Sequence, residues 1–340
     1  MGKDELVMRS RKSSQWITLA VIALAGIWLV RSVLLPVGGA ERITVQIPRG
    51  ASTREIGHIL AARGVVRSSL GFGLLARATG KSGSLKPGAY DLSPAMTPLA
   101  VMDKIARGEV CAKWITFPEG FTIRQVAERL EAEEFGKADS FWRLARYGGA
   151  SFSTGFPHPA GSLEGYLFPD TYLLSIGISE EAVIREMLDC FERKVATPLA
   201  AEISRSGMSL HEVLTVASLI EREARIPKDR SLISAVLHNR LRRNMRLECD
   251  ASVLYALGRH KSRVLYKDLT VDSPYNTYLH GGLPPGPIAN PGLASIKAAL
   301  HPAQVDYLYY VARPDGSHIF SRTMAEHQRA RAVARGKAAR

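Results

Sequence analysis

The longest apolar run in the sequence covers residues 16–37, where Arg31 and Ser32 are the main polar interruptions. A helix needs about 20 apolar residues to cross a bilayer, and an arginine near one end can reach the interface. Four cations lie among residues 1–15, which by the positive-inside rule keeps that end cytoplasmic. We therefore predict a cytoplasmic segment at 1–15, one transmembrane helix at 16–37 and an extracytoplasmic body. A cleavable signal peptide ending at the small residues 38–40 is the alternative.

The next stretch, residues 41–110, alternates between strand and helix patterns. A β-branched run at 42–47 predicts a strand, and Ser52 begins a capped amphipathic helix. A Pro-Gly turn leads into a second short strand, and Thr97 caps another helix that runs to Gly108. The pattern predicts a small β-α module similar to LysM-type carbohydrate-binding modules. A structural module with another ligand fits the pattern equally well.

Residues 111–326 mix helix, loop and hairpin patterns over a longer span. Apolar residues at helical spacing predict a helix over 231–241, and a proline- and glycine-rich stretch at 273–292 predicts a rigid loop. A Pro-Asp-Gly-Ser turn between two strand patterns predicts a hairpin. The predicted fold class is therefore α+β, with a single N-terminal transmembrane helix, the small module at 41–110, a larger mixed domain at 111–326 and a basic tail at 327–340.

Two glutamates, Glu221 and Glu223, end an apolar helical pattern. At about 100° per residue this helix has one buried stripe. The stripe consists of Val213, Val216, Ala217, Ile220 and Ala224. Glu221 lies at the edge of the stripe beside Leu214 and Glu223 at the opposite edge, so the two carboxyl groups do not face each other. Partial burial favours a protonated carboxyl group, which makes Glu221 the candidate acid catalyst. The alternative is that both acids are solvated edge residues.

Further polar and aromatic side chains are candidates for binding an extended ligand. Aromatic rings suit sugar faces, and amide, hydroxyl and guanidinium groups supply hydrogen bonds. The candidates are Glu164 in an aromatic-rich stretch at 162–172, Glu223 at the end of the apolar helical pattern, Asn239 and Arg240 on the 231–241 helix, Asp250, and Tyr275, Asn276 and Tyr278 in the rigid loop. For each of them the alternative is a bracing role within the fold.

Composition narrows the classes of partner and cofactor. The formal net charge is +13, and much of it lies near the two ends of the chain. A body outside the cytoplasm does not meet nucleic acid, whereas it does meet anionic lipid head groups and acidic wall peptides. Three widely spaced cysteines give neither a disulfide framework nor a zinc signature, and the nine histidines include no H-E-x-x-H motif. We predict no metal, no cofactor and no nucleic-acid partner.

Several longer motifs follow one another in an order that resembles a known family. They are Glu119-Gly120, Glu164-Gly165 with Pro169-Asp170-Thr171, Ser218 to Glu223, Asn239-Arg240-Leu241 with Met245, Leu247, Asp250 and Tyr255, Tyr275 to Tyr278, Gly282 to Ile288, Asn290-Pro291-Gly292 and Glu326-His327. The set resembles the YceG/MltG family of membrane-anchored endolytic murein transglycosylases. The resemblance implies a single-pass protein of the bacterial inner membrane whose larger domain, 111–326, is catalytic and extracytoplasmic. It also implies peptidoglycan glycan strands as substrate and peptidoglycan synthases as partners.

The reaction of that family cleaves the β-1,4 bond between N-acetylmuramic acid and N-acetylglucosamine without water and leaves a 1,6-anhydromuramic end. By resemblance, Glu221 is the single acid/base, because the family's essential glutamate is the first acid of the pair. The reaction agrees with the helical positions of Glu221 and Glu223, since no second carboxylate has to face the acid. Two alternatives remain: a hydrolytic muramidase with Glu164 or Asp250 as second carboxylate, and a non-catalytic peptidoglycan-binding scaffold.

Overall fold

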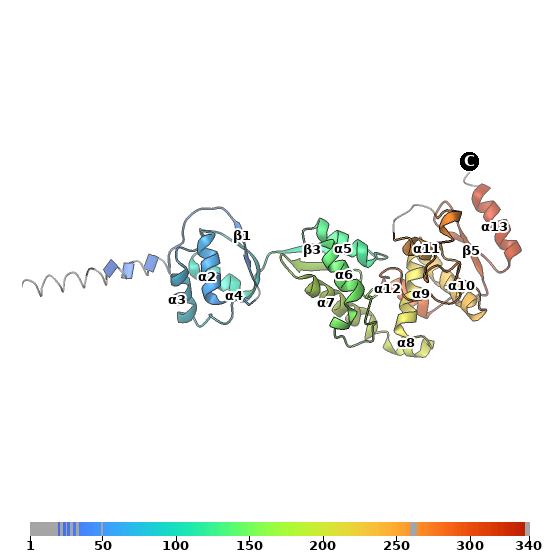
Figure 1. Cartoon of the computed structure of the whole chain (residues 1–340), viewed down its shortest axis with the longest axis horizontal. Coiled ribbons are helices and arrows are strands. Elements are labelled where there is room, and N and C mark those ends of the chain that lie inside the picture. The colour runs from blue at the N-terminus through green and yellow to red at the C-terminus, as the bar shows by residue number, and fades with distance from the viewer. Residues whose placement is uncertain are drawn as a thin grey trace, which may run out of the picture. The chain divides into compact units, whose positions relative to one another are not determined.

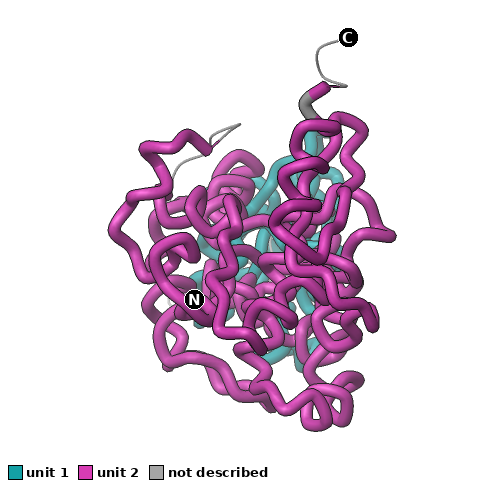
Figure 2. The backbone as a smooth tube through the Cα atoms, turned by 90° about the vertical axis from the view of Figure 1, so that its right-hand side faces the viewer, with its two compact units in different colours: residues 1–113, 173–178 teal, residues 114–172, 179–340 magenta. Residues whose placement is uncertain are grey.

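The computed structural model (Figure 1) describes residues 20, 23–24, 26–27, 30–31, 34–48, 50–258 and 264–336. Most of the predicted transmembrane segment at 16–37 lies outside the described residues. Within the described ranges, no helix is both long enough and apolar enough to span a bilayer. The chain forms two compact units, Met1–Lys113 with Leu173–Ile178 and Trp114–Tyr172 with Ser179–Arg340 (Figure 2).

The first unit combines a two-stranded sheet with three helices. Strand β1 (Ile43–Ile47) pairs antiparallel with β2 (Gly88–Leu92). The helices are α2 (Thr53–Ala62), α3 (Ser69–Ala78) and α4 (Pro98–Arg107). Apolar residues from all five elements fill one core, which includes Val45, Leu60, Phe72, Tyr90 and Met102. The predicted strands and capped helices are confirmed, and α3 is an additional helix.

Side-chain caps explain where these helices begin. The Ser52 hydroxyl accepts a hydrogen bond from the Glu55 N–H, and the Glu55 carboxylate accepts one from the Ser52 N–H, which forms a capping box. At the start of α4 the Thr97 hydroxyl accepts a hydrogen bond from the Ala100 N–H at 3.2 Å, and Gly108 ends that helix in the left-handed conformation at φ 76°. Each cap satisfies backbone groups that the helix itself leaves unpaired.

The second unit contains most of the described helices and one complete strand pair. Its longer helices are α5 (Ile123–Ala132), α6 (Ala138–Tyr147), α7 (Glu180–Phe191), α9 (Leu210–Glu223), α10 (Arg230–Arg242) and α13 (Met324–Gly336). The shorter helices are α8 (Ala200–Ser206), α11 (Asp250–Ala256) and α12 (Leu293–Leu300). Its strand pair is β5 (Tyr309–Ala312) with β6 (His318–Ser321). Strand β3 (Ala112–Thr116) pairs with β4 (Thr171–Ser175), and the residues of these two strands are divided between the two units.

Helix α9 is the central element of the second unit. It packs against α12, α10 and α11. Every residue from Val213 to Ile220 is buried, including Leu214, Thr215 and Ser218 outside the predicted stripe. The prediction of a single buried stripe is therefore too narrow, because neighbouring helices cover more than one side of α9. The buried hydroxyls remain paired: Ser218 donates to the Thr215 carbonyl at 2.8 Å.

Two predictions for the C-terminal part can be compared with the structure. The hairpin is confirmed, with Tyr309 opposite Ser321 and Ala312 opposite His318. The predicted helix at 231–241 corresponds to α10. Much of the segment predicted as a basic tail at 327–340 is helical, because α13 continues to Gly336.

Candidate active site

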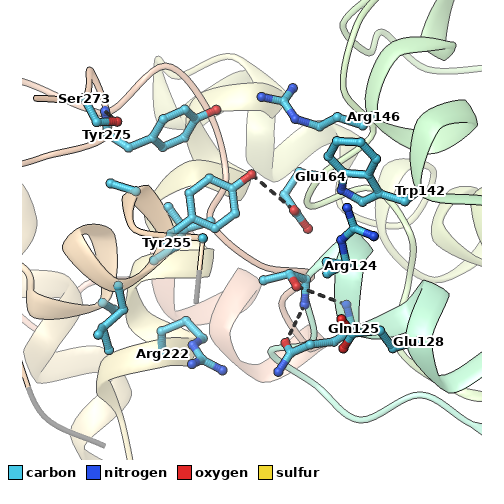
Figure 3. A pocket seen from close by; sticks show the side chains of 16 residues that line it. Arg124, Gln125, Glu128, Trp142, Arg146, Glu164, Arg222, Tyr255, Ser273 and Tyr275 are labelled. Atoms are coloured by element: carbon cyan, nitrogen blue, oxygen red, sulfur yellow. Dashed lines mark hydrogen bonds between the residues drawn. The ribbon is translucent and has the colours of Figure 1, made fainter. Parts of the chain in front are cut away.

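A pocket of about 660 Å³ opens in the second unit between α5, α6 and α11 (Figure 3). It is lined by Thr122, Arg124, Gln125, Glu128, Trp142, Arg146, Glu164, Arg222, Ala251, Leu254, Tyr255, Ala256, Gly258, Ser273, Tyr275 and Ile288. Trp142 lies on one side, and Tyr255 and Tyr275, whose ring centroids are 4.9 Å apart, lie on the other. Aromatic faces flanking a polar centre suit a carbohydrate with polar substituents.

Glu164 lies between these aromatic walls and is only 4% exposed. Its Oε1 accepts hydrogen bonds from the Ile123 N–H at 2.9 Å and from Asn290 Nδ2 at 3.3 Å. Its Oε2 accepts one from the Tyr255 hydroxyl at 3.2 Å. Burial raises the pKa of Glu164 to about 8, because desolvation outweighs these hydrogen bonds. Near neutral pH the carboxyl group is therefore mostly protonated.

Three arginines reach the pocket from different elements. The Arg124 guanidinium stacks on Trp142, with Cζ 4.2 Å from the ring centroid, and also pairs with Asp139 at 2.9 Å. Arg222 donates to the Gly120 carbonyl at 3.2 Å. Arg146, from the last turn of α6, extends into the space between the aromatic walls (Figure 3). The pocket is thus rich in positive charge.

Glu221 lies in the last turn of α9, where its side chain is 8% exposed. Its Oε2 accepts a hydrogen bond from the Gly292 N–H at 3.0 Å, and its Oε1 lies 3.7 Å from Arg230 Nη2. Burial raises the pKa of Glu119, the Glu221 carboxylate raises it further, and Arg230 lowers it. Glu119 and Glu221 therefore form an acidic pair beside one cation. Glu221 is not among the residues that line the pocket.

One short segment, 290–292, connects the two buried acids. Asn290 Nδ2 donates to Glu164, and the Gly292 N–H donates to Glu221. Asn290 Oδ1 also accepts hydrogen bonds from the N–H groups of Gly165 at 2.9 Å and Leu167 at 3.0 Å. Because consecutive Cα atoms are about 3.8 Å apart, the Cα atoms of residues 290 and 292 are at most about 7 Å apart. The Asn-Pro-Gly motif thus contacts both acids from positions two residues apart in the chain.

Glu223, the last residue of α9, lies near Asp250, the first residue of α11. Glu223 accepts a hydrogen bond from the Ala251 N–H at 3.3 Å, and Asp250 accepts one from the Tyr278 hydroxyl at 2.6 Å. Burial raises the pKa of Glu223 to about 7, and the negative charge of Asp250 contributes to this rise. Neither acid lines the pocket, although their neighbour Ala251 does.

Three predicted binding residues are engaged in bracing the fold. Asn239 donates to the carbonyls of Val305 and Tyr307 at 2.9 and 2.8 Å. Arg240 is 6% exposed and donates to the carbonyls of Leu308, Arg246 and Leu247 at 2.6, 2.9 and 3.1 Å. Asn276 is fully buried and donates to the carbonyls of Leu269 and Val271, both at 2.9 Å. Of the predicted site residues, the pocket brings together Glu164 and Tyr275.

The described His, Cys, Asp and Glu side chains do not form a cluster suited to a metal ion. In the part of the chain that the structure describes, no three His, Cys, Asp or Glu residues gather closely enough to hold a metal ion. Cys111, Cys190 and Cys249 are free thiols.

The chain is similar to known proteins over most of its length. A model of the YceG-like family matches residues 45–333. The chain belongs to the YceG-like family. It is 38% identical over 320 residues to an endolytic murein transglycosylase of Bacillus subtilis, with 88% of each chain covered. It is 31% identical over 330 residues to an endolytic murein transglycosylase of Streptococcus pneumoniae, covering 87% of this chain and 59% of that protein. A crystal structure of a yceG-like protein from Listeria monocytogenes aligns with a TM-score of 0.58 and 37% identity, covering 86% of this chain and 99% of that one.

Sequence reasoning missed several residues of this YceG-like site. Trp142 and Arg146 are four residues apart on α6, and Arg124 and Glu128 are four apart on α5, so each pair occupies one helix face. The four-residue spacing of each pair can be read from the sequence and predicts that its two side chains share one helix face. Arg230 carried no such signal, because only the packing of the chain brings it to Glu221.

Proposed function

We propose that this YceG-like chain is an endolytic murein transglycosylase, which cuts between N-acetylmuramic acid and N-acetylglucosamine inside a glycan strand. The observation that carries the proposal is the aromatic-walled pocket with the Asn290–Gly292 segment beside it, which holds the carboxyl groups of Glu164 and Glu221. The names of the Bacillus and Streptococcus relatives support the same activity.

In the proposed mechanism Glu221 is the single acid/base. Its proton passes to the glycosidic oxygen as the bond from that oxygen to C1 of the muramic ring breaks, and positive charge develops on the ring. The C6 hydroxyl oxygen of the same ring then bonds to C1, and its proton passes to the Glu221 carboxylate. The products are a 1,6-anhydromuramic end and a free 4-hydroxyl, and no water is consumed. The Gly292 N–H and Arg230 stabilise the carboxylate after proton donation.

Position in the cell is part of the proposal. The apolar run at 16–37 would anchor the chain in the bacterial inner membrane with both units outside the cytoplasm, where new strands leave membrane-bound peptidoglycan synthases. The small module at 41–110 would hold a glycan strand, as a LysM-like module does. A reporter enzyme that is active only outside the cytoplasm, fused after Arg340, should be active; an inactive reporter would contradict this topology.

Mass spectrometry of the strand ends tests the reaction. The full chain is incubated with uncrosslinked glycan strands, as wild type and as Glu221→Gln. The wild type should produce internal 1,6-anhydro ends, and the variant should be slower by about 10²–10⁴-fold, the usual contribution of a general acid. The control Glu131→Gln removes an exposed carboxylate on α5 that does not line the pocket and should retain full activity.

Other outcomes of this experiment would contradict the proposal in different ways. Reducing ends would identify a hydrolase. The candidate for its second carboxylate is then Glu119, whose pKa is raised by the negative charge of Glu221. Glu164→Gln is measured in the same assay. Loss of activity in this variant combined with full activity in Glu221→Gln would assign the acid to the pocket carboxyl instead. Absence of cleavage by the wild type would favour a binding scaffold.

A further inference from the structure

The pocket contains more positive charge than an uncharged glycan backbone needs. Its lining has three arginines, Arg124, Arg146 and Arg222, and two glutamates, Glu164 and Glu128. Glu164 is buried, and its two oxygens are already occupied by donors from Ile123, Tyr255 and Asn290. Glu128 is exposed. The three arginine charges therefore exceed the carboxylate charge inside the pocket.

Arg146 is the arginine with the fewest contacts: its Cζ lies 5.5 Å from the centroid of the Tyr147 ring. Arg124 is paired with Asp139 and stacked on Trp142, and Arg222 donates to a backbone carbonyl. Among the described residues, no carboxylate oxygen lies within 4.0 Å of the Arg146 guanidinium nitrogens. Its positive charge lowers the pKa of Glu164 and of Tyr275 against the larger effect of burial, which indicates that Arg146 lies near both side chains.

The chemistry of the pocket fits a carboxylate on a short apolar stem. A guanidinium binds a planar carboxylate through two parallel hydrogen bonds. Trp142 and the tilted pair of Tyr255 and Tyr275 supply flat apolar walls. A peptide that begins with a small residue and continues with an acidic one has this combination of groups.

Position relative to Glu221 supports the same ligand. The groups that hold Glu164 and Glu221 are separated by at most about 7 Å of backbone, across residues 290–292. In murein the peptide is attached to the lactyl group of the muramic ring, the same ring whose C1 reacts. A peptide leaving the ring near Glu221 therefore has a short path to the pocket.

We infer that the pocket is a subsite for the acidic peptide of the murein strand, with Arg146 binding a carboxylate of that peptide. This inference rests on the proposed function and extends it, because it makes the enzyme selective for strands that still carry their peptides. Arg146 is a specificity-determining residue in this scheme, and the acid/base role stays with Glu221.

Cleavage of matched strands tests the selectivity. Two strand preparations of the same length are compared, one with intact peptides and one from which an amidase has removed them. The ratio of kcat/KM for peptide-bearing over bare strands should be about tenfold or more for the wild type, the effect of one charge-assisted pair. Arg146→Gln should bring this ratio close to one, and Arg146→Lys should give an intermediate ratio because charge remains without the planar fork.

Arg143, on the same helix as Arg146, provides the control. Arg143→Gln changes an exposed arginine of the same helix that does not line the pocket, and it should keep the wild-type ratio. Equal rates on both strands for the wild type, or an unchanged ratio in a folded Arg146→Gln, would overturn the inference.

A binding measurement separates this inference from the proposed function. Titration calorimetry of the full chain uses N-acetylmuramyl-L-alanyl-D-glutamate whose γ-carboxyl group is amidated, and the analogue in which the α-carboxylate is an amide as well. The acid should bind about tenfold more tightly than the amide, and Arg146→Gln should remove the difference. This holds even if no strand is cleaved, so failure of catalysis and failure of the subsite are distinguishable. Equal binding of acid and amide would overturn the inference. So would displacement of the acid by pyrophosphate added as a competitor, because it would show that the pocket binds any small anion.

Discussion

Glu164→Gln is expected to make the second unit less sensitive to pH. Burial raises the folded pKa of Glu164 to about 8 from an ordinary 4.5. Between these two values the folded chain keeps a proton that the unfolded chain releases. The free energy of unfolding therefore falls as pH rises through this window, by about 1.4 kcal/mol per pH unit from this group. Across the whole window the loss is on the order of 5 kcal/mol, and below pH 4.5 the full stability is present.

Glutamine retains the shape of this side chain and removes its titration. Its amide oxygen can still accept the hydrogen bond that the Ile123 N–H donates to Glu164 at 2.9 Å. The variant should therefore have about wild-type stability at pH 5 and be several kcal/mol more stable than the wild type at pH 8. Burial raises the pKa of Glu223 to about 7, so a fall in stability over the narrower window between pH 4.5 and about 7 should remain in both proteins.

Urea unfolding between pH 5 and pH 8 measures this difference. Trp142 reports on the second unit by fluorescence when Trp16, Trp28 and Trp114 are replaced by phenylalanine. The control Glu131→Gln removes an exposed carboxylate of α5 and should leave the wild-type slope unchanged. Parallel pH profiles for wild type and Glu164→Gln would refute the reasoning, because they would mean that Glu164 ionises equally in both states.

Two further substitutions test how the site is held. Asn290→Ala removes the acceptor for the N–H groups of Gly165 and Leu167 and should lower the free energy of unfolding by about 3 kcal/mol in denaturant titrations; a cost below about 1 kcal/mol would contradict this. Gly165→Ala should lower Tm and slow strand cleavage, because φ is +89° and a Cβ would lie 2.5 Å from Pro287 Cγ. Its control, Gly207→Ala, has φ +74° with open space around it and should cost only about 1 kcal/mol; equal losses for the two glycines would exclude the clash with Pro287.

Helices and strands were predicted correctly where a cap or a turn within a few residues causes them to form. Ser52, Thr97 and the hairpin turn near Pro314 act within a few residues, so the helices and strands that they begin or join follow from the sequence. The apolar pattern before Glu221 likewise predicted a buried helix. The extent of its burial was underestimated, since residues 213–220 are enclosed by helices that come later in the chain.

The order of motifs in the sequence was sufficient to indicate the family, which the match over residues 45–333 shows. The assembly of the pocket depends on tertiary structure. Glu164 is held by Asn290, 126 residues away, and by Tyr255, 91 residues away, while Arg146 comes from a third element. Helical and strand periodicity report only on neighbours within one element. Contacts between distant segments depend on how all elements pack together, and for this reason the pocket, its arginines and the pKa of Glu164 emerge only in the folded chain.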